Sequence, residues 1–181
     1  MKFDHYSLRL FEANDADAFF HLIDRNRSRL EDFFSGTVAR TRTLEDTRTY
    51  TAEIINRITS KTYFPYFLVD NHTQDFMGFF DVKNIDWNIP KGELGFFIDA
   101  AYENKGIAFI AFYHLVQNLI VEQGFNKLFL RTHPTNHAAI ALAEKTGFVK
   151  EGQLRNDYRT IKGDLVDLAY YGLKREEFRN L

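Results

Sequence analysis

Apolar residues recur along this chain with two spacings, and each spacing predicts a different kind of element. Apolar and polar side chains alternate in residues 6–11, which predicts a strand. Farther on they fall three or four positions apart, along a helix expected to begin after Asn14 or Asp15 and to end near Phe34. The same spacings predict strands at 63–70, 76–82, 93–99, 128–130, 149–154 and 165–173, and helices at 43–61, 106–123 and 136–147.

The predicted order of elements is β-α-α-β-β-β-α-β-α-β-β, which indicates a fold of the α/β class. Residues 128–130 follow a helix and are apolar throughout, as strands of parallel pairs are. Residues 63–70 and 76–82 are joined by a short polar turn and form an antiparallel hairpin. We therefore expect a mixed sheet with helices on both faces. No linker or repeat divides the 181 residues, so we expect a single domain over 1–181.

One stretch of the chain combines a strand, a turn and a helix in a way that predicts an anion site. The apolar strand at 94–98 ends in a polar turn, and a long apolar helix opens directly at Gly106. The first N–H groups of a helix are unpaired and lie at the positive end of its dipole, so they attract phosphate. Gly106 has no side chain to keep an anion from the backbone. The spacing fits neither a P-loop nor a dinucleotide fingerprint.

Composition narrows the possible classes of function. The net charge of −2 comes from 23 basic and 25 acidic side chains spread along the chain, so no surface for free nucleic acid is expected. Cysteine is absent, which excludes disulfides and thiolate metal ligands. No secretory signal pattern or apolar run of ~20 residues is present, so we expect a cytoplasmic protein without membrane contact. The 19 phenylalanines predict an aromatic core and leave a homodimer open.

Residues 103–108, Glu-Asn-Lys-Gly-Ile-Ala, resemble the pyrophosphate loop of the GNAT N-acetyltransferases. The pattern in that family is Gln/Arg-x-x-Gly-x-Gly/Ala, placed between the fourth strand and the helix that follows. Gly106 and Ala108 fit the pattern, whereas Glu103 puts an acid where the family has Gln or Arg. The acid is expected to weaken phosphate binding unless its side chain turns to solvent.

A second segment resembles the same family. Residues 136–148 are similar to the family pattern Asn-x-x-Ala/Ser-x-x-x-x-Glu-Lys-x-Gly-Phe. Residues 26–30 and 163–178 resemble the branch that contains the ribosomal-protein N-terminal acetyltransferases. The predicted element order is also that of the acetyltransferase fold. The resemblance therefore covers nearly the whole chain.

The resemblance implies an activity and a set of cofactor contacts. The implied reaction is direct transfer of acetyl from acetyl-CoA to a primary amine, expected to be the α-amino group of a protein N-terminus. Backbone N–H groups of the fourth strand would polarise the thioester carbonyl. Asn136 would hydrogen-bond the cofactor, although it equally suits a plain helix cap. The residues implied to bind acetyl-CoA are Phe97, Ile98, Glu103, Asn104, Lys105, Gly106, Ile107, Ala108 and Asn136.

The side chains that would transfer protons depart from the family pattern. Many relatives carry a Tyr seven positions after the Asn, where this chain has Ala143, and the ribosomal branch can use a Ser where it has Ala139. The catalytic candidates are therefore Glu93, at the start of the fourth strand, and Tyr158, before the last strand. Each also has a plainer interpretation: Glu93 as an exposed charge at a strand end, and Tyr158 as a core or rim residue.

No metal site is expected, and two other functions remain open. His133 and His137 are four residues apart, but Pro134 and the helix cap separate them, so they do not share a helix face. One alternative is acetylation of a small amine such as a polyamine or an aminoglycoside. The other is a non-catalytic acyl-CoA-binding module, which the absent Tyr and Ser and the acid at Glu103 favour.

Overall fold

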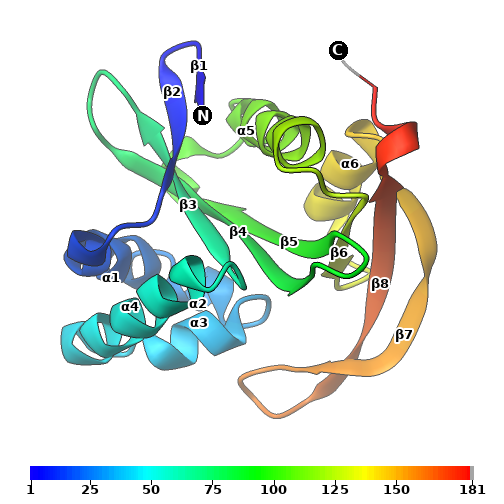
Figure 1. Cartoon of the computed structure of the whole chain (residues 1–181). Coiled ribbons are helices and arrows are strands. Elements are labelled where there is room, and N and C mark those ends of the chain that lie inside the picture. Colours follow the sequence, from blue (N-terminus) through cyan, green and yellow to red (C-terminus); the bar gives the residue numbers. More distant parts are fainter. Residues whose placement is uncertain (180–181) are drawn as a thin grey trace.

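The computed structural model describes residues 1–179, so the last two residues of the predicted domain lie outside the described part. One eight-stranded sheet runs through these residues in the order β1-β2-β3-β4-β5-β6-β8-β7 (Figure 1). Neighbouring strands are antiparallel except β5 and β6, which confirms the expected mixed sheet. The strands are β1 (Lys2–Phe3), β2 (Tyr6–Leu10), β3 (Phe64–Asp70), β4 (Phe76–Asp86), β5 (Lys91–Ile98), β6 (Lys127–Thr132), β7 (Val149–Arg159) and β8 (Leu165–Lys174).

Helices cover both faces of the sheet, as predicted. Figure 1 shows α1 to α4 on one face and α5 and α6 on the other. Among residues 1–179, no helix combines the length and the apolar character needed to cross a membrane. The helices are α1 (Ala16–Asp24), α2 (Arg27–Leu30), α3 (Ser35–Arg40), α4 (Leu44–Thr59), α5 (Ile107–Gln117) and α6 (His137–Lys145).

Aromatic side chains fill an apolar cluster on each face of the sheet, which confirms the predicted phenylalanine-rich core. Phe79 and Phe80 are neighbours in β4 and point to opposite faces, because side chains alternate along a strand. Phe79 stacks on Phe19 of α1 with ring centroids 5.0 Å apart. On the other face, Phe96 of β5 packs on Phe112 of α5 with centroids 4.9 Å apart. The two clusters fix β4 and β5 between the helical layers.

Local cap chemistry sets the start of α4 as predicted. The Thr43 hydroxyl accepts the Asp46 N–H at 3.1 Å, and the Asp46 carboxylate accepts the Thr43 N–H at 3.2 Å. This reciprocal pair satisfies two N–H groups that a helix start otherwise leaves unpaired. At α1 the predicted cap differs, because Asp15 makes no side-chain cap and instead binds Arg9 at 2.7 Å.

The prediction of one continuous helix to about Phe34 is wrong in its second half. α1 ends at Asp24, α2 is a separate short helix, and α3 was not predicted. The break lies at Asn26, whose fully buried side chain donates to the Leu22 carbonyl at 2.9 Å and accepts the Ala100 N–H at 3.1 Å. This contact with the end of β5 outweighs the helical spacing, so a tertiary interaction places the boundary.

Several other element ends also differ from the prediction. β1 was not predicted, and β4 and β7 run on to Asp86 and Arg159. The helix expected over 106–123 changes from α to π geometry after Gln117. β7 is mostly exposed and is held by pairing with β8 as far as Arg159 opposite Leu165. Burial patterns cannot predict such an extension, because backbone pairing rather than an apolar face maintains it.

Candidate functional site

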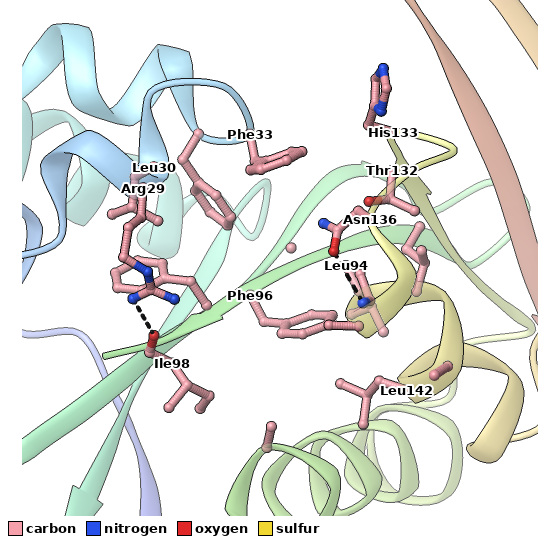
Figure 2. Close-up of a pocket in the computed structure, with 18 of the residues that line it drawn as sticks. Arg29, Leu30, Phe33, Leu94, Phe96, Ile98, Thr132, His133, Asn136 and Leu142 are labelled. Carbon is pink, nitrogen blue, oxygen red and sulfur yellow. Dashed lines mark hydrogen bonds between the residues drawn. The ribbon is translucent and has the colours of Figure 1, made fainter. Parts of the chain in front are cut away.

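A cavity of about 800 Å³ opens where β5 and β6 separate. The two strands pair in parallel only as far as Glu93 and Phe129, while β5 continues to Ile98. In Figure 2, α2 lies on one side of the cavity and the β6–α6 segment on the other, with Phe96 between them. All eleven predicted site residues line this one cavity: Glu93, Phe97, Ile98, Glu103, Asn104, Lys105, Gly106, Ile107, Ala108, Asn136 and Tyr158.

Beyond Glu93, the edge of β5 that faces the cavity has no strand partner. The Asp99 N–H donates to the Met77 carbonyl at 2.9 Å, so Asp99 turns its backbone toward β4. Backbone groups alternate along an antiparallel strand, so Phe97 also faces β4, whereas Ile98 and Phe96 face the cavity. Of the two predicted backbone donors, Ile98 is therefore on the open edge and Phe97 is not. Phe96, which the sequence analysis did not include, presents its backbone to the same open edge as Ile98.

The loop at 103–108 joins the end of β5 to the start of α5 along the cavity wall. Gly106 precedes the helix with a φ of 75°, a left-handed conformation that favours glycine. A methyl group added at Gly106 would meet no protein atom within 4 Å. Ile107 and Ala108 carry the first N–H groups of α5, which have no partner within the helix. The open space at Gly106 and these donors match the predicted anion site.

Glu103 forms an ion pair with Arg29 of α2. Both side chains are partly exposed, at 43% for Glu103 and 40% for Arg29. Arg29 also donates to the Asn26 side chain at 2.9 Å and to the Ile98 carbonyl at 3.4 Å, the latter drawn in Figure 2. The acid in the loop therefore neither stands alone nor simply turns to solvent, because it holds an arginine beside the loop. Sequence spacing gave no sign of this pairing.

Asn136 lies across the cavity from Arg29 in Figure 2. Its Oδ1 accepts the Ala139 N–H at 3.2 Å, so the predicted helix cap is confirmed. The cap uses the oxygen alone, which leaves the amide nitrogen available to a ligand. The two functions considered for Asn136 are therefore compatible at different atoms. Ala139 also lines the cavity, whereas Ala143 is fully buried in the core beneath it.

Glu93 is buried at the closed end of the cavity, so its interpretation as an exposed strand-end charge is wrong. Its side chain is 6% exposed and accepts two hydrogen bonds from Arg131 of β6, at 2.9 and 3.3 Å. Asn84 donates to the same carboxylate at 2.6 Å. Arg131 also binds Asp157 of β7 at 2.6 Å. Burial alone would lower the pKa of Arg131, but the two carboxylates outweigh it and the pKa is raised.

Tyr158 of β7 reaches across to the start of α3. Its hydroxyl donates to the Ser35 hydroxyl at 2.5 Å and accepts the Ser35 N–H at 2.9 Å. The phenol therefore joins the β7–β8 hairpin to the helical layer over the closed end of the cavity. Tyr158 lines this end together with Glu93, as the choice of both as catalytic candidates requires.

Lys83 of β4 adds a positive charge to the same end of the cavity. Its ammonium lies 3.8 Å from the buried Asp81 carboxylate and 5.6 Å from the centre of the Phe34 ring. Burial lowers the pKa of Lys83, but Asp81 and Glu93 raise it more, so the pKa is above its ordinary value. Lys83 therefore stays charged at neutral pH. Sequence analysis missed Lys83 and Arg131. Both lie in strands, where the alternation of apolar and polar residues predicts which face of the sheet a side chain is on but not which residues it contacts.

The described residues include no group of three His, Cys, Asp or Glu side chains placed to hold a metal ion. His133 lines the cavity, and its Nδ1 lies 2.7 Å from the Thr135 hydroxyl, which belongs to the turn before α6. His137 is the first residue of α6, beyond the Asn136 cap. The groups that line the cavity are backbone donors, a helix start and the charged cluster at its closed end.

A family model described as "Acetyltransferase (GNAT) domain" matches residues 6–149. The chain belongs to the GNAT acetyltransferase family. A Bacillus subtilis (strain 168) protein provisionally named ribosomal N-acetyltransferase, YdaF, is 28% identical over 182 residues, which cover 97% of this chain and 94% of the relative. The resemblance given in the sequence analysis is thereby confirmed, and the enzyme is an N-acetyltransferase by family.

Solved structures of the family share the fold across nearly the whole chain. RimL, a ribosomal L7/L12 α-N-protein acetyltransferase in complex with coenzyme A, matches with a TM-score of 0.87 at 17% identity, over 95% of each chain. A chimera of Vibrio cholerae spermidine N-acetyltransferase SpeG and hSSAT matches with a TM-score of 0.82 at 17% identity, over 98% of this chain and all of the other. At these identities the likeness establishes the fold and does not choose between the acceptors.

Proposed function

We propose that this protein transfers an acetyl group from acetyl-CoA to the α-amino group of a protein or peptide N-terminus. The observation that carries the proposal is the single cavity that joins three parts: the start of α5, the unpaired edge of β5 and a charged closed end. These parts match a phosphate group, an extended amide arm and a reacting thioester, in that order. An elongated ligand with a diphosphate at one end suits this arrangement.

The diphosphate would lie at the loop of residues 103–108, against the first N–H groups of α5. The pantetheine arm would pair along the open edge of β5, where Phe96 and Ile98 present their backbones. Asn136 would donate its amide nitrogen from the opposite wall. The thioester would then lie farther along β5, toward Glu93, where the cavity closes between β5 and β6.

The proposed chemistry is a direct transfer. The neutral amine attacks the thioester carbonyl carbon, and the carbonyl oxygen takes the negative charge, which a backbone N–H on the open edge of β5 stabilises. The carbon–sulfur bond then breaks, the amine gives up one proton to solvent, and the coenzyme A thiolate leaves and takes a proton. We assign that proton donor to Tyr158, whose hydroxyl hydrogen-bonds to the Ser35 hydroxyl and regains a proton from solvent after the transfer.

Glu93 is better suited to positioning Arg131 than to removing a proton from the amine. Its carboxylate already accepts hydrogen bonds from Arg131 and Asn84, so its oxygens are not free to take a proton from a bound amine. An α-amino group has a pKa of about 7.7–8.0, so about a tenth is already neutral at about pH 7. Such an acceptor needs little help from a base.

A small polyamine is the second candidate acceptor, because the solved structures that share the fold include a spermidine N-acetyltransferase chimera as well as RimL. Among the described residues, the closed end holds three carboxylates and two cations, and a polyamine is disfavoured because these carboxylates are already paired. Lys83 and Arg131 bring two cations there, and the carboxylates of Glu93, Asp157 and Asp81 already face them. A polycation would have to displace these pairs. A peptide N-terminus carries only one positive charge. Its first carbonyl oxygen can also accept a hydrogen bond from a cation of the cavity.

The test is a binding isotherm for acetyl-CoA followed by thiol release with an acceptor panel. We expect saturable binding of acetyl-CoA, and release of free coenzyme A thiol only when a peptide with a free N-terminus is added. The same peptide with a blocked N-terminus is the matched control. Binding without thiol release on any amine would favour the non-catalytic module, and no binding at all would contradict the proposal.

A further inference from the structure

The loop at 103–108 lacks a free cation for a diphosphate. Its first residue is the acid Glu103, and its one lysine, Lys105, donates to the Ala101 carbonyl at 3.1 Å. The Lys105 ammonium also lies 5.1 Å from the centre of the Tyr102 ring. The loop is thus left with backbone donors and an acid, although a diphosphate carries two negative charges. A cation from another element would have to complete the site.

Arg29 is placed to be that cation. Its guanidinium contacts two parts that the cofactor would touch, Glu103 in the loop and the Ile98 carbonyl on the open edge of β5, and it is held from behind by Asn26 of the α1–α2 turn. The turn is itself anchored, because the fully buried Asn26 side chain accepts the Ala100 N–H. A rigid support therefore aims Arg29 at the cavity wall.

The other cations of the cavity have different surroundings. Lys83 and Arg131 are at the closed end beside carboxylates, away from the loop. Lys145 of α6 lies with its ammonium 4.0 Å from the centre of the Phe109 ring, in the first turn of α5. Arg29 alone among these contacts the loop directly. Its planar fork of N–H groups also matches phosphate oxygens two at a time, which an ammonium cannot do.

We propose that Arg29 binds the diphosphate of acetyl-CoA, and that the ion pair with Glu103 holds the Arg29 guanidinium beside the loop until the cofactor binds. The inference rests on the proposed function, because it takes acetyl-CoA as the ligand. On binding, the phosphate oxygens replace the Glu103 carboxylate, and an amide N–H of the pantetheine arm replaces Arg29 at the Ile98 carbonyl. Both contacts that Arg29 gives up are exposed or long, so the exchange leaves no buried group unpaired.

The first test compares acetyl donors that differ only in their phosphates. Arg29→Gln is expected to lower kcat/KM at least tenfold for acetyl-CoA and for acetyl-dephospho-CoA, which keeps the diphosphate, and less than twofold for S-acetylpantetheine, which has no phosphate. Arg48→Gln is the matched control, because it also removes an exposed arginine–carboxylate ion pair, here with Asp17, but lies outside the cavity. It is expected to change none of the three values.

Three outcomes would overturn the assignment. Equal losses on all three donors would mean that Arg29 only supports the fold. A loss on acetyl-CoA with none on acetyl-dephospho-CoA would place Arg29 at the 3′-phosphate. No loss on any donor would remove Arg29 from the site. If the wild-type protein binds no acetyl-CoA, the proposed function fails as well, and this result is distinct from the other three.

The second test asks how Glu103 acts. Glu103→Gln releases Arg29, so it is expected to tighten acetyl-CoA binding in the wild-type background and to have no effect when Arg29 is already Gln. Calorimetry at low salt measures the two effects, since screening hides charge contributions at high salt. Equal tightening in both backgrounds would mean that Glu103 repels phosphate directly, which contradicts the exchange.

Discussion

The open space at Gly106 allows a substitution that separates ligand binding from folding. Gly106 has a φ of 75°, and an added methyl group would meet no protein atom within 4 Å. Gly163, in the turn between β7 and β8, shares both properties, with a φ of 95° and no neighbour within 4 Å, but it does not line the cavity. Gly106→Ala and Gly163→Ala are therefore a matched pair, with equal backbone strain and different access to a ligand.

The expected magnitudes follow from the backbone and from the lost phosphate contact. An alanine in the left-handed region costs about 1–2 kcal/mol, so both variants are expected to lose about that much free energy of unfolding. In Gly106→Ala the methyl group also lies where a phosphate would approach the N–H groups of α5. Losing one charge-assisted hydrogen bond costs about 1.5–3 kcal/mol, which corresponds to about a 10- to 100-fold weaker affinity for acetyl-CoA.

Urea unfolding and titration calorimetry measure the two quantities on the same samples. We expect similar losses of stability in the two variants and a weaker acetyl-CoA affinity only in Gly106→Ala. Unchanged affinity in a folded Gly106→Ala variant would refute the phosphate site at the start of α5. Equal loss of affinity in both variants would trace the effect to stability rather than to the site.

Two further substitutions test the closed end of the cavity. Glu93→Gln is expected to lower the free energy of unfolding by about 1–3 kcal/mol, because Arg131 loses a buried carboxylate partner, and to slow transfer without altering the shape of the pH–rate profile. A lost acidic limb in that profile would instead make Glu93 the base. Lys83→Gln is expected to raise kcat/KM for spermidine relative to a peptide, on the order of threefold or more, by removing a repulsive charge. Because the pKa of Lys83 is raised, this increase of the variant over the wild-type protein should persist from about pH 6.5 to about 9.5. If the variant and the wild-type protein have the same ratio of kcat/KM for spermidine to kcat/KM for the peptide, Lys83 does not select the acceptor.

Local chemistry made part of the fold and of the site predictable. The Thr43–Asp46 pair and the Asn136 cap depend on residues within three positions of each other, so the sequence displays them directly. The left-handed glycine at the start of α5 is equally local. The sequence analysis placed a helix start at residue 43, a helix cap at Asn136 and another helix start at Gly106. The loop therefore could be located before the fold was known.

Contacts between distant elements could not be predicted in this way. Arg29 meets Glu103 across 74 positions, and Tyr158 meets Ser35 across 123, so no local spacing indicates either pair. The choice between Phe97 and its neighbours as backbone donors required the pairing register of β5 on β4. In that register every second residue of β5 points its N–H and C=O groups to the open edge, and the residues between point theirs to β4. Sequence spacing also did not show the ion pairs that position the charges of the cavity, because their two partners lie on different elements.

The most direct test of the central claim is the rate of acetyl transfer to two classes of amine at about pH 7. At that pH a lysine-like amine, with a pKa near about 10.4, is neutral to less than about one part in a thousand, whereas an α-amino group is neutral to about one part in ten. Steady-state kinetics with acetyl-CoA would compare free-N-terminus peptides of varied first residue with spermidine and with N-terminally blocked, lysine-containing peptides. We expect kcat/KM to be higher for at least one free N-terminus than for either other acceptor. A higher kcat/KM for spermidine than for every peptide would contradict the assignment and favour a small-amine acetyltransferase.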